Sequence, residues 1–291
     1  MNHHPAYRAW CAAALLAAAP ASLAQQTSSA PAESAKERLE ALLQDFDKAQ
    51  NSYFEALSKL PEAEQEKYFE QHAPPDAKAW APKVWAIADE VRKTPAAMRA
   101  LEWLFQSVRE PAERSKALGR ILEDHLADPG LKNVCLGLAY DRGDEGEKFL
   151  QSVLEKGADT AKAFAHYALA KRAVSAVETA ERLRGMKPEE RTRMAKFYGQ
   201  AEVDRLAAAD PKALSAAAEK LLDEVAAKYT EVEVRKGQSI AESAKAELFE
   251  MRNLVVGKTA PDIVGEDLDG AAFKLSDYRG KVVVLDFWGN W

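Results

Sequence analysis

The residue types that carry nucleophilic, redox and metal chemistry are scarce in this sequence. Its 291 residues include two cysteines, Cys11 and Cys135, and five histidines. Cys135 lies in an apolar stretch between Val134 and Leu136 and has no basic or metal-binding neighbour in sequence. Because a buried cysteine behaves as a small hydrophobic residue, we interpret Cys135 as a structural thiol of the core, not a reactive one.

The histidines do not form a metal-binding or catalytic pattern either. His72, His125 and His166 are far apart in sequence, and none belongs to an i,i+4 pair or a Glu-x-x-His motif. Asp124 directly precedes His125, but adjacent residues on a helix point in different directions, so this pair is not a catalytic dyad. We therefore predict no metal site, no cofactor and no catalytic group within this chain.

The strongest local pattern lies at the C-terminal end of the sequence, in residues 281–291. Residues 281–287 form a β-branched and aromatic run that follows Gly280 and is too short for a typical helix. Such a run is typical of a strand that is covered on both faces. It leads into Trp288-Gly-Asn-Trp291, the beginning of a loop. The elements before this run must therefore position a buried strand and the turn at its end.

Three stretches before the strand complete a family pattern. They are Val256-Gly-Lys-Thr-Ala-Pro-Asp262, Asp267-Leu-Asp-Gly270 and Phe273-Lys-Leu-Ser-Asp-Tyr-Arg-Gly280. With the strand and the loop, they resemble the opening of exported thioredoxin-like redoxins of the TlpA and AhpC/TSA group. The resemblance covers residues 253–291. In that family Cys-x-x-Cys follows at once, so we expect both redox cysteines just beyond Trp291 and a chain that is truncated before them.

The resemblance implies an α/β thioredoxin-like domain and thiol-disulfide exchange through a mixed disulfide. In such a site a helix N-terminus lowers the pKa of the attacking thiol below its free value of ~8.5. Trp288 and Trp291 would flank the site and wall the thiols with apolar surface; the alternative is that they are core aromatics. Since the partner strands are missing, residues 281–287 would expose backbone groups and apolar side chains.

The same resemblance implies partners of two kinds, protein thiols or disulfides and a membrane electron donor. A peroxiredoxin-like (AhpC/TSA) antioxidant is a less favoured alternative. Its reactive cysteine lies farther along a Pro- and Thr-rich loop, whereas the spacing of Trp288 and Trp291 favours the oxidoreductase.

Local signals predict how the chain approaches the strand. The Ala-Pro pair at 260–261 favours an extended backbone. The Asp-Gly pair at 269–270 predicts a hairpin turn between a strand that contains Ile263 and a strand at 273–275. Residues 276–278 are expected to form a short capped turn.

Residues 1–24 have the pattern of a cleaved secretory signal peptide. Arg8 precedes an apolar run, and Ser-Leu-Ala24 fits the small-x-small rule for cleavage after Ala24. The run is shorter than the ~20 apolar residues that span a bilayer. We therefore expect export to the periplasm or cell envelope, with no membrane span after cleavage. Loss of Cys11 would leave Cys135 as the single thiol, which excludes an internal disulfide.

The middle of the chain is predicted to be helical. Residues 25–34 are small, polar and aperiodic and are expected to be a flexible linker. Residues 35–252 show apolar residues at steps of three and four, beginning with the stripe from Leu39 to Leu57, and suggest about ten helices. Prolines near the first turn mark helix starts, at positions 61, 74–75, 95, 111, 129, 188 and 211.

A weak internal repeat suggests how these helices are arranged. Segments 94–105, 128–139 and 159–170 are similar and start 34 and then 31 residues apart, a spacing typical of stacked helix pairs. The predicted fold class is mainly α, a solenoid-like stack of helix pairs, followed by the first strands of an incomplete α/β thioredoxin-like domain. The alternative is that alanine-rich helices resemble one another by composition alone.

The net charge, the spacing of opposite charges and the tryptophans indicate which partners and surfaces to expect. The formal charge of −6 argues against a nucleic-acid partner and provides no polybasic membrane anchor. Opposite charges at helical spacing are expected to mark solvated faces, at Glu178 with Arg182, Glu181 with Arg184, Glu202 with Arg205, and Glu224 with Lys228. Trp80, Trp85 and Trp103 are expected to anchor the core; the alternative is that they line a ligand cleft between helices.

Two classes of function remain. The first is an exported thiol-disulfide oxidoreductase whose helical region holds the redoxin domain near a partner. The second is a non-catalytic helical protein-interaction module, for which residues 35–252 would suffice. The cysteines expected beyond Trp291 decide between these two classes.

Overall fold

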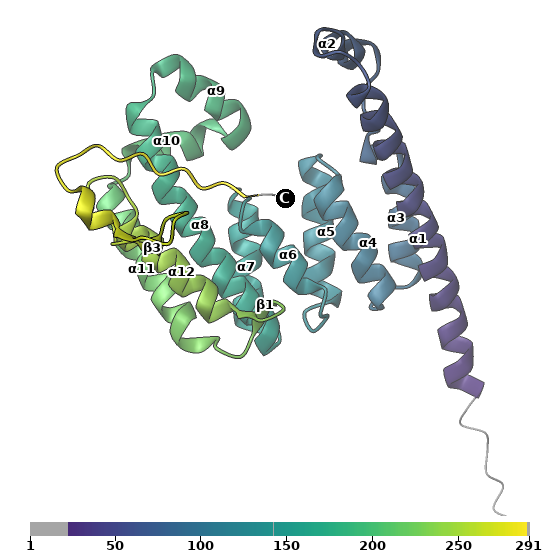
Figure 1. Cartoon of the computed structure of the whole chain (residues 1–291). Coiled ribbons are helices and arrows are strands. Elements are labelled where there is room, and N and C mark those ends of the chain that lie inside the picture. Colours follow the sequence, from purple (N-terminus) through teal and green to yellow (C-terminus); the bar gives the residue numbers. More distant parts are fainter. Residues whose placement is uncertain (1–22, 142, 290–291) are drawn as a thin grey trace, which may run out of the picture. The chain divides into compact units, whose positions relative to one another are not determined.

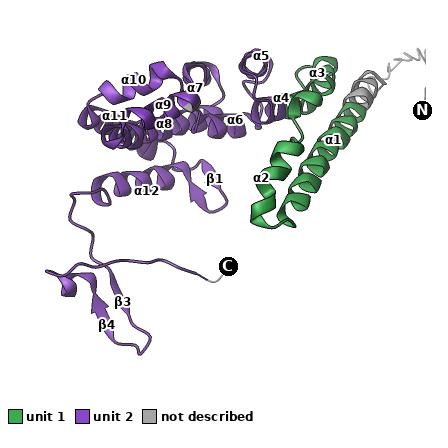
Figure 2. Cartoon of the chain, turned by 90° about the horizontal axis from the view of Figure 1, so that it is seen from above, with its two compact units in different colours: residues 1–100 green, residues 101–291 purple. Residues whose placement is uncertain are grey.

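The computed structural model of the protein describes residues 23–141 and 143–289, with the side chains of residues 33–141, 143–196 and 198–289. Most of the predicted signal peptide 1–24 therefore lies outside the described residues. The chain forms two compact units, residues 1–100 and residues 101–291 (Figure 2).

The first unit is helical throughout its described part. It contains α1 (Leu23–Ser58), α2 (Glu62–Gln71), the 3-10 helix η1 (Ala77–Ala79), α3 (Ala81–Glu90) and the start of α4 (Pro95–Ser107), which continues into the second unit. The predicted stripe on α1 is confirmed as its core face, because Leu39, Leu43, Phe46, Tyr53 and Leu57 are buried. Trp85 on α3 is buried as expected, and so is Trp103 on α4.

Aromatic side chains hold α1 against the segment around η1. The rings of Phe46 and Trp80 meet edge to face with centroids 5.2 Å apart. Trp80 Nε1 donates a hydrogen bond to Asp45 Oδ2 at 3.1 Å, and the Tyr53 hydroxyl donates to the His72 carbonyl at 2.7 Å. Trp80 and Tyr53 therefore contribute apolar area while their polar atoms keep partners.

The backbone of residues 25–34 is helical and forms the first turns of α1, which corrects the expectation of a flexible linker. Alanine and glutamine in this segment have high helix propensity. In addition, extending a helix that is already nucleated adds one hydrogen bond per residue fixed. The buried turns that follow Ala35 provide that nucleus.

The second unit contains the remaining helices and both hairpins. Its helices are α5 (Pro111–Asp124), α6 (Leu131–Leu138), α7 (Asp144–Lys156), α8 (Asp159–Gly185), α9 (Pro188–Tyr198), α10 (Gln200–Ala208), α11 (Pro211–Lys228) and α12 (Ile240–Asn253). The strands β1 (Glu233–Arg235) and β2 (Gln238–Ser239) pair antiparallel, as do β3 (Val264–Glu266) and β4 (Ala272–Lys274), and the 3-10 helix η2 (Leu275–Tyr278) follows.

Twelve α-helices thus occur among the described residues, somewhat more than the sequence suggested. Four of them begin at a predicted proline, namely α4, α5, α9 and α11, and Pro61 immediately precedes α2. Proline fits these positions because the first helical N–H groups have no intrahelical partner.

Helix α8 is the central element of the second unit (Figure 1). It packs against α6, α7, α10, α11 and α12. Every residue from 163 to 170 is buried, so this stretch of the helix is covered on all sides and not along one face. Alanine supplies many of the buried positions, and its small side chain lets the neighbouring helices approach closely.

Residues 233–239 form a hairpin, where the sequence was expected to be helical. Gly237, with φ of 76°, provides the left-handed turn residue. Ser239 then starts α12 through a capping box: its hydroxyl accepts from the Glu242 amide at 3.1 Å, and Glu242 Oε2 accepts from the Ser239 amide at 2.8 Å. The Ser-x-x-Glu spacing was the overlooked sequence signal.

No helix within the described part of the chain combines the length and the apolar character needed to span a bilayer.

Substitution of Leu222 tests the packing around α11. Leu222 is 0% exposed, and α11 packs against both α8 and α12. We expect Leu222→Ala to lower the free energy of unfolding by about 2–5 kcal/mol, measured by urea denaturation, because it leaves a cavity in the core. Lys212→Ala, at an exposed position of the same helix, is the matched control. A loss below about 1 kcal/mol at Leu222 would contradict this packing.

Candidate redox segment

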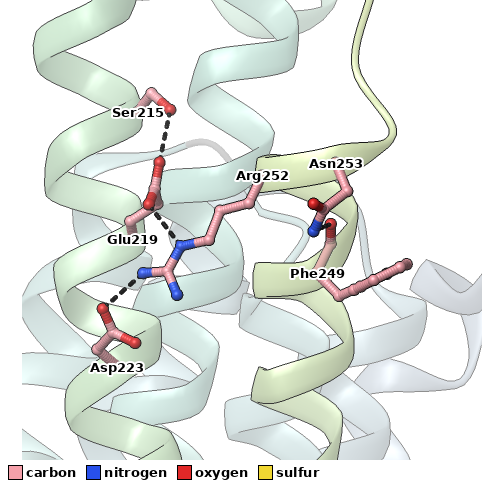
Figure 3. Close-up of polar contacts among 6 residues, drawn as sticks. All are labelled: Ser215, Glu219, Asp223, Phe249, Arg252 and Asn253. Atoms are coloured by element: carbon pink, nitrogen blue, oxygen red, sulfur yellow. Dashed lines mark hydrogen bonds and ion pairs between the residues drawn. The ribbon is translucent and has the colours of Figure 1, made fainter. Parts of the chain in front are cut away.

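The candidate site begins where α12 ends. Arg252 Nε donates to Glu219 Oε2 at 2.8 Å, and Arg252 Nη2 donates to Asp223 Oδ2 at 2.7 Å (Figure 3). The Ser215 hydroxyl supports Glu219 through a 3.5 Å contact with its other oxygen. The last turn of α12, from which residues 254–289 leave the helical part, is therefore fixed to α11.

The β3–β4 hairpin is the best-formed part of this segment. Its turn lies where the Asp-Gly pair at 269–270 predicted it, and Gly270 has φ of 80°. Asp267 Oδ1 accepts from the amides of Asp269 and Ala271, both at 2.9 Å. This role of Asp267 was not predicted, although an Asp that accepts from amides two and four residues later is a common turn signal. The strand expected to contain Ile263 begins one residue later.

A carboxylate clip closes the open end of the hairpin. Asp262 accepts from the Ser276 amide and from the Ser276 hydroxyl, both at 2.8 Å. These hydrogen bonds favour the ionised form and hold the pKa of Asp262 below its usual value. Asp277 Oδ2 accepts from the Lys274 amide at 3.1 Å. The predicted short capped turn at 276–278 is thereby confirmed within η2.

Residues 281–287 do not form the predicted buried strand in the described structure. Val282 is 97% exposed, and Trp288 is 84% exposed. A strand is stable only when neighbouring strands satisfy its backbone groups and cover its apolar faces, and no described strand pairs with these residues. The exposure expected in the absence of partner strands is therefore confirmed. The second flanking tryptophan, Trp291, lies outside the described residues.

Cys135 is fully buried on α6, as predicted. Burial disfavours the thiolate and raises the pKa of this thiol to about 12. Since the thiolate is the reactive form, Cys135 cannot serve as a redox nucleophile at neutral pH.

Each of the three histidines lies beside a residue of another type. His72 stacks on Tyr68 with ring centroids 4.4 Å apart. His125 Nδ1 lies 3.8 Å from Asp128, and His166 Nε2 lies 3.5 Å from Glu224. Both of these histidines are buried, and burial lowers their pKa values despite the nearby carboxylates. Within the described ranges, no group of three or more potential ligands could hold a metal ion.

The opposite charges at helical spacing lie mostly on exposed positions, as expected for solvated faces. Glu202 and Arg205 form an ion pair, at 2.7 Å. Glu224 Oε1 lies 4.0 Å from Lys220 Nζ. Because an exposed pair contributes only ~0–1 kcal/mol, side-chain entropy readily opposes it.

Chemical labelling tests the burial of Cys135. In a Cys11→Ser variant Cys135 is the single thiol. We expect Ellman's reagent at about pH 8 to leave the native chain unmodified and to modify the thiol fully in ~6 M guanidinium chloride, because only unfolding exposes it. A variant that also carries Cys135→Ser gives the background. Rapid reaction of the native chain would show that Cys135 is accessible.

The buried histidine on α8 should make stability depend on pH. An unfolded histidine takes up a proton at about pH 6.5. Burial lowers the pKa of His166, so in the folded chain its ring stays neutral to a lower pH. Unfolding is therefore favoured as pH falls from above ~6.5 towards the lower folded pKa, and the loss levels off below that value.

We expect His166→Gln to flatten the decline of the urea midpoint between about pH 7.5 and 5.5. His72→Gln, at an exposed position, is the control and should decline like the unmodified chain. Equal pH dependence in all three proteins would rule out a contribution from His166.

Comparison with known proteins finds short matches. The chain is 58% identical over 38 residues to the thiol-disulfide oxidoreductase ResA of Geobacillus thermodenitrificans (strain NG80-2), which covers 13% of this chain and 22% of that protein. ResA of Geobacillus kaustophilus (strain HTA426) is 60% identical over 38 residues, with the same coverage. ResA of Bacillus subtilis (strain 168) is 51% identical over 35 residues, 12% of this chain and 20% of that protein.

The chain thus spans about a fifth of the length of the curated relatives it matches. No family model and no solved structure gives a significant match. The matches relate a short part of this chain, at the family level, to thioredoxin-like thiol-disulfide oxidoreductases.

Proposed function

We propose that residues 253–291 open a thioredoxin-like redoxin domain and that the protein is an exported thiol-disulfide oxidoreductase of the TlpA-like group. The observation that carries this proposal is the 58% identity over 38 residues to a ResA protein, a match almost as long as this segment. The hairpin, the Asp262 clip and the apolar run that ends at Trp288 are the described parts of the proposed domain.

The exposed run 281–288 is the feature that the proposal explains best. Its apolar side chains lack any covering element among the described residues. Burial of such surface is worth ~25 cal/mol per Å², so partner strands and helices would turn an unfavourable exposed run into the central strand of a sheet. In that arrangement Trp288 and Trp291 flank the site.

The proposed chemistry needs a Cys-x-x-Cys directly after Trp291. The first cysteine, as a thiolate, attacks one sulfur of a substrate disulfide, and the other substrate sulfur leaves as a thiolate. The second cysteine then attacks the mixed disulfide, so that the enzyme is oxidised to a disulfide and the substrate is released as a dithiol. The reverse sequence oxidises a substrate dithiol.

We propose that the helices within residues 35–252 form a solenoid-like stack that holds this domain near a protein partner. Support comes from α6, which packs against both α7 and α8, and from α5, which packs against α7. Contacts of a helix with the next helix and the next but one in sequence are typical of stacked helix pairs. With a signal peptide cleaved after Ala24, the partners would be envelope proteins with thiols or disulfides, or a membrane electron donor.

The second candidate function is a non-catalytic helical interaction module. One observation favours it: the single cysteine thiol among the described residues, that of Cys135, is buried and has a pKa of about 12. The candidates differ in whether redox cysteines are joined to the segment 253–291.

Sequencing and an activity assay test the redox proposal together. We expect the coding DNA beyond the Trp291 codon to encode Cys-x-x-Cys, and the correspondingly extended protein to catalyse insulin reduction by dithiothreitol. The chain 1–291 should show no turnover above background, because Cys135 is inaccessible. The matched control is the extended protein with both motif cysteines replaced by serine. A missing motif, or an inactive extended protein, would favour the interaction module.

A further inference from the structure

A groove in the helical part is not used by the proposed redox chemistry. It has a volume of about 290 Å³ and is lined by residues of α8, α11 and α12 and by the first residues after α12. Val174 and Val177 on α8 provide an apolar floor, together with Met251 on α12 and with Leu254 and Val255. Leu254 is 57% exposed, so the apolar lining extends to the surface.

Glutamates line the rim of this groove. Glu178 and Glu181 lie one turn apart on α8, and Glu247 and Glu250 lie one turn apart on α12. Lys171 forms an ion pair with Glu247. No ion pair joins Glu178, Glu181 or Glu250 to another described residue, so the rim carries an excess of negative charge beside an apolar floor.

The arginine of α12 does not pair with this rim. Arg252 belongs to the last turn of the helix, but its guanidinium group donates to Glu219 and Asp223 on α11 (Figure 3). The two hydrogen bonds, at 2.8 and 2.7 Å, commit both its Nε and its Nη2. Glu178, Glu181 and Glu250 therefore have no ion pair with this arginine and are exposed.

We propose that this groove binds a segment of a partner polypeptide in which lysine or arginine alternates with aliphatic residues. The aliphatic side chains would occupy the floor, and the cations would face Glu178, Glu181 and Glu250. A volume near the lower end of the ~300–1,000 Å³ range of ligand pockets suits a few side chains better than a large compact ligand. Charge complementarity and the apolar floor together select this chemistry.

The position of the groove connects it to the rest of the chain. Leu254 and Val255, at one end of the groove, are also the first residues of the segment that leads to the β3–β4 hairpin. A bound segment would lie next to the residues that connect α12 to the proposed redoxin domain. The binding itself does not rest on the redox function and can be tested with the chain as it stands.

The test uses a short fluorescein-labelled peptide of alternating lysine and leucine, with fluorescence anisotropy as the readout. We expect saturable binding at low salt that weakens as salt is raised, because the rim charges are exposed and screened. Glu178→Gln combined with Glu181→Gln should weaken binding about tenfold, since each exposed charge pair contributes up to ~1 kcal/mol.

The matched control for charge is Glu64→Gln combined with Glu66→Gln, at exposed positions of α2, which should bind like the unmodified chain. Leu254→Ser removes apolar lining and should also weaken binding. Urea denaturation of each variant establishes that it is folded. Peptides of alternating glutamate and leucine, or lysine and serine, should bind far more weakly.

Three results would overturn the proposal. Equal binding by the rim variant and the charge control would exclude the groove. Binding that is abolished by Val282→Ser with Val284→Ser, but not by the rim substitutions, would place the peptide on the exposed run 281–288. Self-association of the unmodified chain in sedimentation, relieved by the rim substitutions, would identify a second copy of this chain as the occupant.

Discussion

The burial of residues 163–170 in α8 is the constraint on which the second unit depends. Because residues 163–170 are all buried, this stretch can be stable only if neighbouring helices cover it. Lys171 pairs with Glu247 on α12, and Arg172 donates to the carbonyls of Leu138 and Gly143 at 3.1 and 3.0 Å. Packing and polar pairing therefore fix the neighbours of α8 together.

Contacts of α12 with α8 and α11 fix the point at which the candidate redox segment leaves the helical part. Helix α12 is tied to α8 by the Lys171–Glu247 pair and to α11 by Arg252, which contacts Glu219 and Asp223. Because both ties lie in the second half of α12, they fix the direction in which the chain leaves the helix. The segment beyond it is held by its own hydrogen bonds, chiefly those of Asp262 and Asp267.

The sequence predicted features that depend on local chemistry and missed those that depend on distant partners. Proline at helix starts and Gly270 in the hairpin turn were foreseen, because each acts through its own backbone geometry. The ties of Arg252 join residues 29 and 33 positions apart, which no spacing rule reveals. Glu178 and Arg182 were expected to mark a solvated face, and both are exposed. The hairpin at 233–239 and the helical start of α1 were overlooked because composition suggested otherwise.

The β3–β4 hairpin is formed and the run 281–288 is exposed, because the hairpin depends on nearby partners and the run on distant ones. The hairpin satisfies its backbone groups through partners within 14 residues, by strand pairing and by the carboxylates of Asp262, Asp267 and Asp277. A central strand needs neighbours on both edges and cover on both faces, and these come from distant parts of a domain. Under the proposed function, the clip between Asp262 and Ser276 places the start of the run before those neighbours are added. Local hydrogen bonds would then set the position of the central strand, and long-range packing would supply its stability.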